Sequence, residues 1–128
     1  PVLINSFMAP RQPLIKFPYN GNDYVFIDDV INAFKIAVEQ DVKSGIYNIG
    51  SGSSTTVINL SKIVEFVVTG DYKITKNVEN TSTQHEGAPN FWASPVKSKK
   101  YLRWEANTPL KEGVKSTYSS IKDKYEKT

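Results

Sequence analysis

The sequence has no cysteine and one histidine among its 128 residues. The absence of cysteine excludes disulfides, a thiolate nucleophile and a cysteine-based zinc site, and it fits either redox compartment. A single histidine, His85, leaves serine–histidine–aspartate and multi-histidine metal arrangements short of partners. No apolar run is long enough to span a bilayer or to serve as a signal peptide. We therefore expect a cytoplasmic protein with no bound metal and no membrane partner.

Charge of either sign is moderate, with 16 Lys and Arg against 13 Asp and Glu and a net charge of +3. The positive excess lies in residues 97–128, beginning with the KSKK stretch at 97–100. These lysines alternate with apolar residues at helical spacing, whereas nucleic-acid readers usually carry more arginines or stacking aromatics. We expect a solvated helix face and no nucleic-acid partner.

The length suits one compact domain, residues 1–128, and no internal repeat divides it. Prolines and an N-G-N turn predict an extended entry segment over residues 1–23. Residues 24–53 predict a strand, a helix and a second strand, and residues 54–128 are mostly helical in pattern. This order of strands and helices indicates an α/β architecture with few short strands and about four helices.

The unit at 24–53 has local signals for each of its elements. Tyr24–Ile27 and Ile46–Ile49 are β-rich runs, and Asp28 or Asp29 can cap the helix between them. The apolar positions of that helix are Val30, Ile31, Phe34, Ala37 and Val38. The glycines of GSG at 50–52 favour a tight turn over a phosphate cradle, because no Lys or Arg follows closely. The second strand is expected to need partners from elsewhere, so the chain should expose an apolar edge and self-associate.

The remaining residues contain two strongly periodic helices. The first of these is predicted to end at Gly70, and its apolar positions are Leu60, Ile63, Val64 and Val67. A short strand at Tyr72–Thr75 and a polar loop over residues 77–90 are expected next. Ser94-Pro95 and Thr108-Pro109 are typical helix starts. The last helix places on one face Leu110, Val114, Tyr118, Ile121 and Tyr125.

Three segments together resemble a known family. They are YVFIDDVINAFKIAVE at 24–39, GIYNIGSG at 45–52 and FWASPVKSKKYLRW at 91–104. In this order they are similar to the C-terminal part of the NAD-dependent epimerase/dehydratase family, the extended short-chain dehydrogenases. That family's glycine-rich dinucleotide fingerprint lies near its N-terminus, and neither G-x-x-G-x-x-G nor G-x-G-x-x-G occurs here. We therefore expect a C-terminal fragment in which the Rossmann core is mostly absent.

The resemblance implies how the fragment and its parent divide their tasks. Residues 24–53 would complete the edge of the Rossmann sheet, and residues 54–128 would form the substrate lobe. The full-length protein would be an NAD(P)-dependent enzyme acting on a nucleotide-sugar, by isomerase, lyase or oxidoreductase chemistry. The fragment alone would bind no cofactor and be inactive. Its expected partners are the missing N-terminal Rossmann domain, a nucleotide-sugar and a second copy in a homodimer.

The family's catalytic pair is a Tyr followed four residues later by a Lys on one helix. Tyr72 with Lys76 and Tyr118 with Lys122 have this spacing. We expect no catalytic residue in the chain, because Tyr72 falls in a predicted strand and Tyr118 in the apolar stripe of the last helix. Both pairs also follow GIYNIGSG, whereas the family's pair precedes it.

The resemblance also implies a set of substrate-binding residues. The positions that match the family's substrate contacts are Ser6, Arg11, Asn22, Tyr24, His85 and Phe91. Asn22 and His85 stand where the family has phosphate-binding arginines, and Ala88 stands in place of an Asp. Losing guanidinium contacts removes charge-assisted hydrogen bonds of about 1.5–3 kcal/mol each. Two hypotheses remain: the substrate-binding portion of a nucleotide-sugar enzyme, or a non-catalytic scaffold relative or interaction module without diphosphate recognition.

Overall fold

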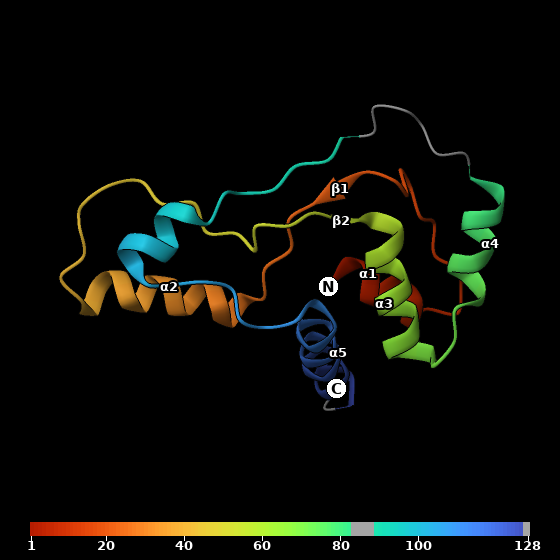
Figure 1. The fold of residues 1–128 in the computed structure, drawn as a ribbon. Helices are drawn as coiled ribbons and strands as arrows, with labels where there is room; N and C mark the ends of the chain where they lie inside the picture. Colours follow the sequence, from red (N-terminus) through yellow and green to blue (C-terminus); the bar gives the residue numbers. More distant parts are fainter. Residues whose placement is uncertain (83–88, 127–128) are drawn as a thin grey trace.

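Helix α3 lies at the centre of the larger of two packed regions in the computed structural model, which describes residues 1–82 and 89–126. It contacts α1, α4 and α5 (Figure 1). Among the described residues there are two short strands and six helices, one of them a π-helix. In chain order they are α1 (Val2–Met8), β1 (Gly21–Asn22), α2 (Ile27–Glu39), β2 (Thr55–Thr56), α3 (Val57–Thr69), α4 (Lys73–Thr81), the π-helix η1 (Ser98–Leu102) and α5 (Leu110–Glu126). The predicted α/β class is confirmed, with more helices than the expected four.

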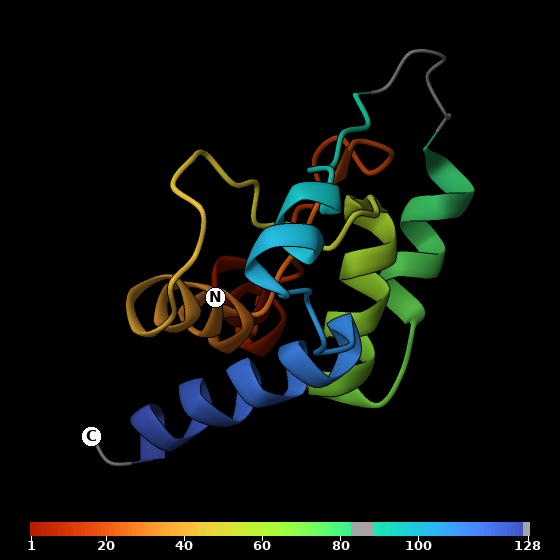
Figure 2. The same ribbon diagram turned by 60° about the vertical axis from the view of Figure 1, so that its left-hand side comes forward.

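The described residues form two clusters of buried apolar side chains. The larger joins α1, α3 and α5 through Ile4, Phe7, Val64 and Val114. The smaller lies between α2 and η1, which are adjacent in both views, and centres on Trp104 (Figures 1 and 2). The antiparallel pair of β1 and β2 runs between the two regions, with Gly21 opposite Thr56. No described helix is both long and apolar enough to cross a membrane.

The helices predicted from strong periodicity form as expected. Helix α3 begins with the Thr56 side chain accepting a hydrogen bond from Asn59 N, and it ends at Gly70 in the left-handed region at φ 78°. Helix α5 begins after Pro109, and its stripe packs on the larger cluster as far as Ile121. Figure 2 shows the C-terminal end of α5 extending away from the other helices, and Tyr125 is exposed there.

The prediction of an extended entry segment was wrong at its start. Residues Val2–Met8 form α1, because Ile4 and Phe7 reach the buried side chain of Val64 from one helical face. The first proline after the helix is Pro10, so no ring interrupts it. Packing against α3 therefore favours a helix at Val2–Met8, where the composition of the segment predicted an extended chain.

Two predicted strands, Tyr24–Ile27 and Ile46–Ile49, do not form in the described part of the chain. A β-run needs hydrogen-bonding neighbours, and the only paired strands among the described residues are the two-residue β1 and β2. The backbone at 24–26 and 46–49 is irregular, and Ile27 begins α2 instead.

The predicted strand Tyr72–Thr75 was also wrong, as was the start of the predicted 77–90 loop. Residues Lys73–Thr81 form α4, since the buried Glu65 carboxylate accepts hydrogen bonds from Ile74 N and Thr75 N at its first turn. Residues 83–88 of the predicted loop lie outside the described residues.

The predicted capping role of Asp28 or Asp29 is replaced by a different one. In the part of the chain that the structure describes, no side chain caps α2, although both carboxylates lie in its first turn, where negative charge is favourable. Asp29 instead holds the distant segment before α5. Its Oδ2 accepts from Thr108 N at 2.9 Å, and its backbone oxygen accepts from Trp104 Nε1 at 2.8 Å.

Several of the apolar positions of helix α2 named from the sequence are exposed in the structure. Ala33 is buried against η1, whereas Ile31, Phe34 and Val38 are exposed. With Ile27, these residues form an apolar row along the helix that no described element covers.

Candidate functional site

Three segments distant in sequence meet at the carboxylate of Asp23, directly after β1. Its Oδ1 accepts hydrogen bonds from Ser51 Oγ at 2.6 Å and from Ser51 N at 3.0 Å. Its Oδ2 accepts from Ala93 N at 3.1 Å and approaches Ser51 N at the same distance. The carboxylate therefore joins β1 to the turn after Gly50 and to the segment that precedes η1.

These hydrogen bonds also set the charge state of Asp23. Partial burial acts to raise its pKa, but donors on the Ser51 side chain and on the backbone of Ser51, Ala93 and Gly52 stabilise the ionised form. The net pKa of Asp23 lies below its ordinary value. The group is an anion at neutral pH.

The glycines of the turn serve this junction in two ways. A Cβ on Gly50 would lie 2.5 Å from both Ala93 Cβ and Asp23 Oδ2, so the absence of a side chain permits the close approach. Gly52 has φ +79°, which favours glycine, and lies against Pro95. The conformational role predicted for one of these two glycines is thus seen at Gly52, whereas Gly50 serves close packing.

The same turn is unsuited to hold the phosphates of a dinucleotide. A phosphate cradle offers free backbone N–H groups. Here Ser51 N already donates to the carboxylate of Asp23, and Ser53 N donates to the Ser51 hydroxyl. The residues present therefore do not fit a nicotinamide cofactor at this turn.

The junction brings together three of the predicted substrate-binding residues. Asn22 and Tyr24 flank Asp23 in the chain, and Asn22 Nδ2 lies 3.5 Å from the Tyr24 hydroxyl. Phe91 N donates to Gly21 O at 3.4 Å, next to the parallel bridge between Gly21 and Asn90. The Phe91 side chain is 61% exposed and free to contact a ligand.

The other predicted substrate residues lie elsewhere. Ser6 and Arg11 line a separate open pocket formed by α1, the segment after it and the end of α4. The Ser6 hydroxyl donates to Val2 O at 2.9 Å within its own helix. His85 lies outside the described residues. The structure thus groups Asn22, Tyr24 and Phe91, and separately Ser6 and Arg11.

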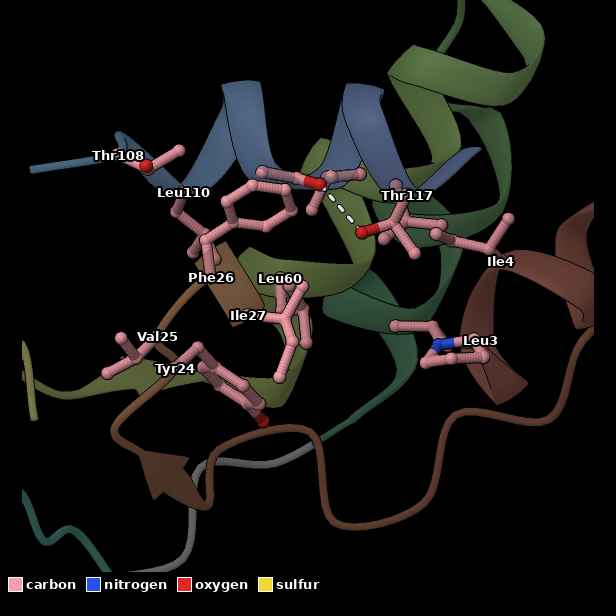
Figure 3. Close-up of a pocket in the computed structure, with 14 residues that line it drawn as sticks. Leu3, Ile4, Tyr24, Val25, Phe26, Ile27, Leu60, Thr108, Leu110 and Thr117 are labelled. Carbon is pink, nitrogen blue, oxygen red and sulfur yellow. Dashed lines mark hydrogen bonds between the residues drawn. The ribbon is translucent and has the colours of Figure 1, made fainter. Parts of the chain in front are cut away.

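A second feature was not anticipated from the sequence. An open, largely apolar pocket of about 490 Å³ lies between α1, α3, the start of α5 and the segment 24–27 (Figure 3). Tyr24 and Phe26 form part of its wall, with Leu60 and Leu110 from two of the helices. Each segment carries an apolar pattern, but no pattern indicates that these particular segments face one another.

The two Tyr–Lys spacings occupy different environments. Tyr72 precedes α4 and stacks on Phe66 with ring centroids 5.1 Å apart, so the assumption that it opens a strand was wrong. It lines an open groove together with Lys76. Tyr118 packs against the larger apolar cluster, and Lys122 pairs with Glu126. Neither the packing of Tyr118 nor the stacking of Tyr72 points to a role in proton transfer, and the absence of a catalytic residue from the chain stays a prediction.

Known proteins with similar sequences are enzymes of nucleotide-sugar metabolism. The dTDP-4-dehydro-6-deoxyglucose reductase of Escherichia coli is 28% identical over 104 residues, which are 80% of this chain and 31% of that protein. The dTDP-D-glucose 4,6-dehydratase of Bos taurus is 26% identical over 107 residues, 80% of this chain and 30% of that protein. The chain spans about a third of the length of these relatives. No family model matches it.

Solved structures match the fold over almost the whole chain. The UDP-glucose 4-epimerase of Thermotoga maritima, solved with UDP-glucose, aligns with a TM-score of 0.75 at 22% identity, covering 97% of this chain and 39% of that one. The Bordetella bronchiseptica enzyme WbmF, solved with NAD⁺ and UDP, aligns with a TM-score of 0.76 at 20% identity, covering 97% and 35%. The chain has part of the extended short-chain dehydrogenase fold. The resemblance to NAD-dependent epimerases and dehydratases predicted from the sequence is therefore confirmed.

Proposed function

We propose that this chain is the C-terminal, substrate-binding portion of an NAD(P)-dependent nucleotide-sugar epimerase, dehydratase or reductase. The cofactor fingerprint and the catalytic Tyr and Lys then belong to a Rossmann domain outside these 128 residues. The observation that carries the proposal is the junction at Asp23. It brings Asn22, Tyr24 and Phe91 to one place, and these are positions that match the family's substrate contacts.

The proposed ligand surface has lost positive charge relative to the family. Asn22 offers an amide donor where the family has a guanidinium, and His85 is proposed to supply a single donor in place of a second arginine. Arg11 lies in another pocket. We infer that the protein binds a nucleotide-sugar diphosphate less tightly than an enzyme with both arginines, and more tightly when His85 is protonated.

The decisive experiment measures UDP-glucose affinity of the whole protein at about pH 5.5 and about pH 8, either side of the reference histidine pKa of about 6.5. The variants are His85→Ala and His85→Arg, with Asn22→Arg as a second restored arginine. His85→Arg should tighten binding and remove the pH dependence, while His85→Ala should weaken the binding at low pH. Equal affinity of all proteins at both pH values would contradict a phosphate contact and favour the non-catalytic scaffold.

The cofactor is assigned to the rest of the protein. The chain lacks the glycine fingerprint, and in its GSG turn Ser51 N already donates a hydrogen bond to Asp23. We therefore expect the 128-residue chain alone to bind neither NAD nor NADP and to catalyse no hydride transfer. Calorimetric titration of the chain with both dinucleotides tests this. Micromolar binding would refute the proposed division.

A further inference from the structure

The Asp23 side chain has different partners from the two proposed ligand contacts beside it in the chain. The Asp23 carboxylate is held by Ser51 and Ala93, whereas the side chains of Asn22 and Tyr24 approach each other. The 3.5 Å approach of Asn22 Nδ2 to the Tyr24 hydroxyl agrees with this arrangement. The carboxylate can therefore bind Ser51 and Ala93 without occupying the position of a ligand at Asn22 and Tyr24.

Among the described residues, two backbone hydrogen bonds join the segment that carries Phe91 to Gly21 of β1. Gly21 N donates to Pro89 O at 2.7 Å, and Phe91 N donates to Gly21 O at the longer distance of 3.4 Å. Beyond Phe91, the Ala93 N–H is held by Asp23. Residues 89–93 are thus fixed to the strand at two points, one at Gly21 and one at Asp23.

The Asp23 anchor is also charge-assisted, and it is closely packed against Gly50. A carboxylate accepts about four hydrogen bonds, and those from Ser51 and Ala93 largely fill that capacity. Asp23 and Ala93 leave no room for a side chain at position 50, which glycine occupies. A small movement of either segment would break these contacts, so the junction has one well-defined geometry.

We propose that Asp23 is a positioning residue, which fixes the segment at Phe91–Ala93 and the turn at Ser51 against β1 and thereby sets Phe91 relative to Asn22 and Tyr24 for ligand binding. This inference rests on the proposed function, because it concerns the same surface. It assigns Asp23 no contact with a ligand.

The test compares Asp23→Asn with Asp71→Asn in the whole protein. Asn is nearly isosteric with Asp but loses the charge and turns one acceptor into a donor that faces donors. Asp71 is a matched control, since it also accepts a backbone hydrogen bond, from Tyr72 N at 2.7 Å, but lies in the connection between α3 and α4. A milder variant, Ser51→Ala, removes only the side-chain donor and serves if Asp23→Asn fails to fold.

The first measurement is amide hydrogen exchange over residues 50–53 and 89–94. Asp23→Asn should accelerate exchange in both segments about ten-fold, and Ser51→Ala about three-fold over residues 50–53, whereas Asp71→Asn should change neither. This result does not depend on any ligand. Unchanged exchange in both Asp23→Asn and Ser51→Ala would overturn the proposal.

The second measurement is the Kd for UDP-glucose, used as the probe. We expect Asp23→Asn to raise it about ten-fold while far-UV circular dichroism stays the same, and Asp71→Asn to leave it unchanged. Faster exchange with an unaltered Kd would overturn the positioning role. If the wild type itself does not bind UDP-glucose or UDP, the proposed function fails, and exchange alone still decides whether Asp23 holds the Phe91 segment.

Discussion

Three glycines separate the effect of backbone strain from that of close packing. Gly70 has φ +78° and no atom of the described residues within 4 Å of an added Cβ, so Gly70→Ala should lose only the conformational preference, about 1 kcal/mol of unfolding free energy. Gly52 has φ +79° and an added Cβ 2.9 Å from Pro95 Cγ. Gly52→Ala combines strain with overlap, and we expect a loss of about 2 kcal/mol.

The third glycine isolates overlap without strain. Gly50 does not have a positive φ, but an added Cβ would lie 2.5 Å from both Ala93 Cβ and Asp23 Oδ2. Overpacking alone destabilises by about 1–3 kcal/mol, and displacing Ala93 would also break its hydrogen bond to the carboxylate. We expect Gly50→Ala to lose about 3 kcal/mol or more, the largest effect of the three.

Equilibrium urea denaturation, followed by far-UV circular dichroism, measures the series, with equal m values required for comparison. The expected order of destabilisation is Gly50→Ala, Gly52→Ala, Gly70→Ala, and added phosphate should not change it. A Gly50→Ala loss no greater than that of Gly70→Ala would refute the close approach at Asp23. Protection of the wild type but not of Gly52→Ala by phosphate would show that the turn binds anions.

Three further predictions concern charge and exposed surface. Glu65→Ala removes a buried acceptor of three hydrogen bonds at the start of α4 and should lower the urea-measured unfolding free energy by about 3 kcal/mol; a loss below about 1 kcal/mol would contradict this. The pKa of Asp23 is lowered in the folded protein, so the ionised carboxylate stabilises the fold above its unfolded pKa, and this stabilisation is lost as the pH falls through the folded pKa. In urea titrations, the difference in unfolding free energy between wild type and Asp23→Asn should therefore be constant near neutrality and shrink below about pH 4. A pH-independent difference would exclude this linkage. The isolated chain should self-associate through the exposed apolar row of α2. In sedimentation velocity, Phe34→Lys should shift the chain toward monomer, whereas the control Leu14→Lys, at another exposed apolar residue, should not. A monomeric wild type would refute self-association through α2.

The sequence alone predicted a helix correctly where the helix contains its own N-terminal cap, periodic apolar residues and terminating glycine. The Thr56 cap, the periodic apolar residues and Gly70 define α3 without reference to other segments. Helix α4 shows the opposite case, because its start depends on Glu65 from α3 and the local run Tyr72–Thr75 alternates like a strand. Partners that come from elsewhere in the fold are not visible in a local window.

The same limit applies to the candidate site. The resemblance indicated Asn22, Tyr24 and Phe91, and the structure brings them together. Asp23 was missed, although it lies between two of them, because its partners are 28 and 70 residues away. The glycine turn is visible in the sequence, but the lack of space for a side chain at Gly50 depends on Ala93, which is distant in sequence.

The negative charge of Asp23 is compatible with the proposed anionic ligand because hydrogen-bond donors surround the carboxylate. An isolated carboxylate would repel a diphosphate, whereas this one accepts hydrogen bonds from the Ser51 hydroxyl and from the backbone of Ser51 and Ala93. Those donors partly offset the field of the carboxylate, which is turned toward Ser51 and Ala93. The Asp23 carboxylate thereby joins three segments of the chain, while the neutral side chains of its neighbours Asn22 and Tyr24 approach each other.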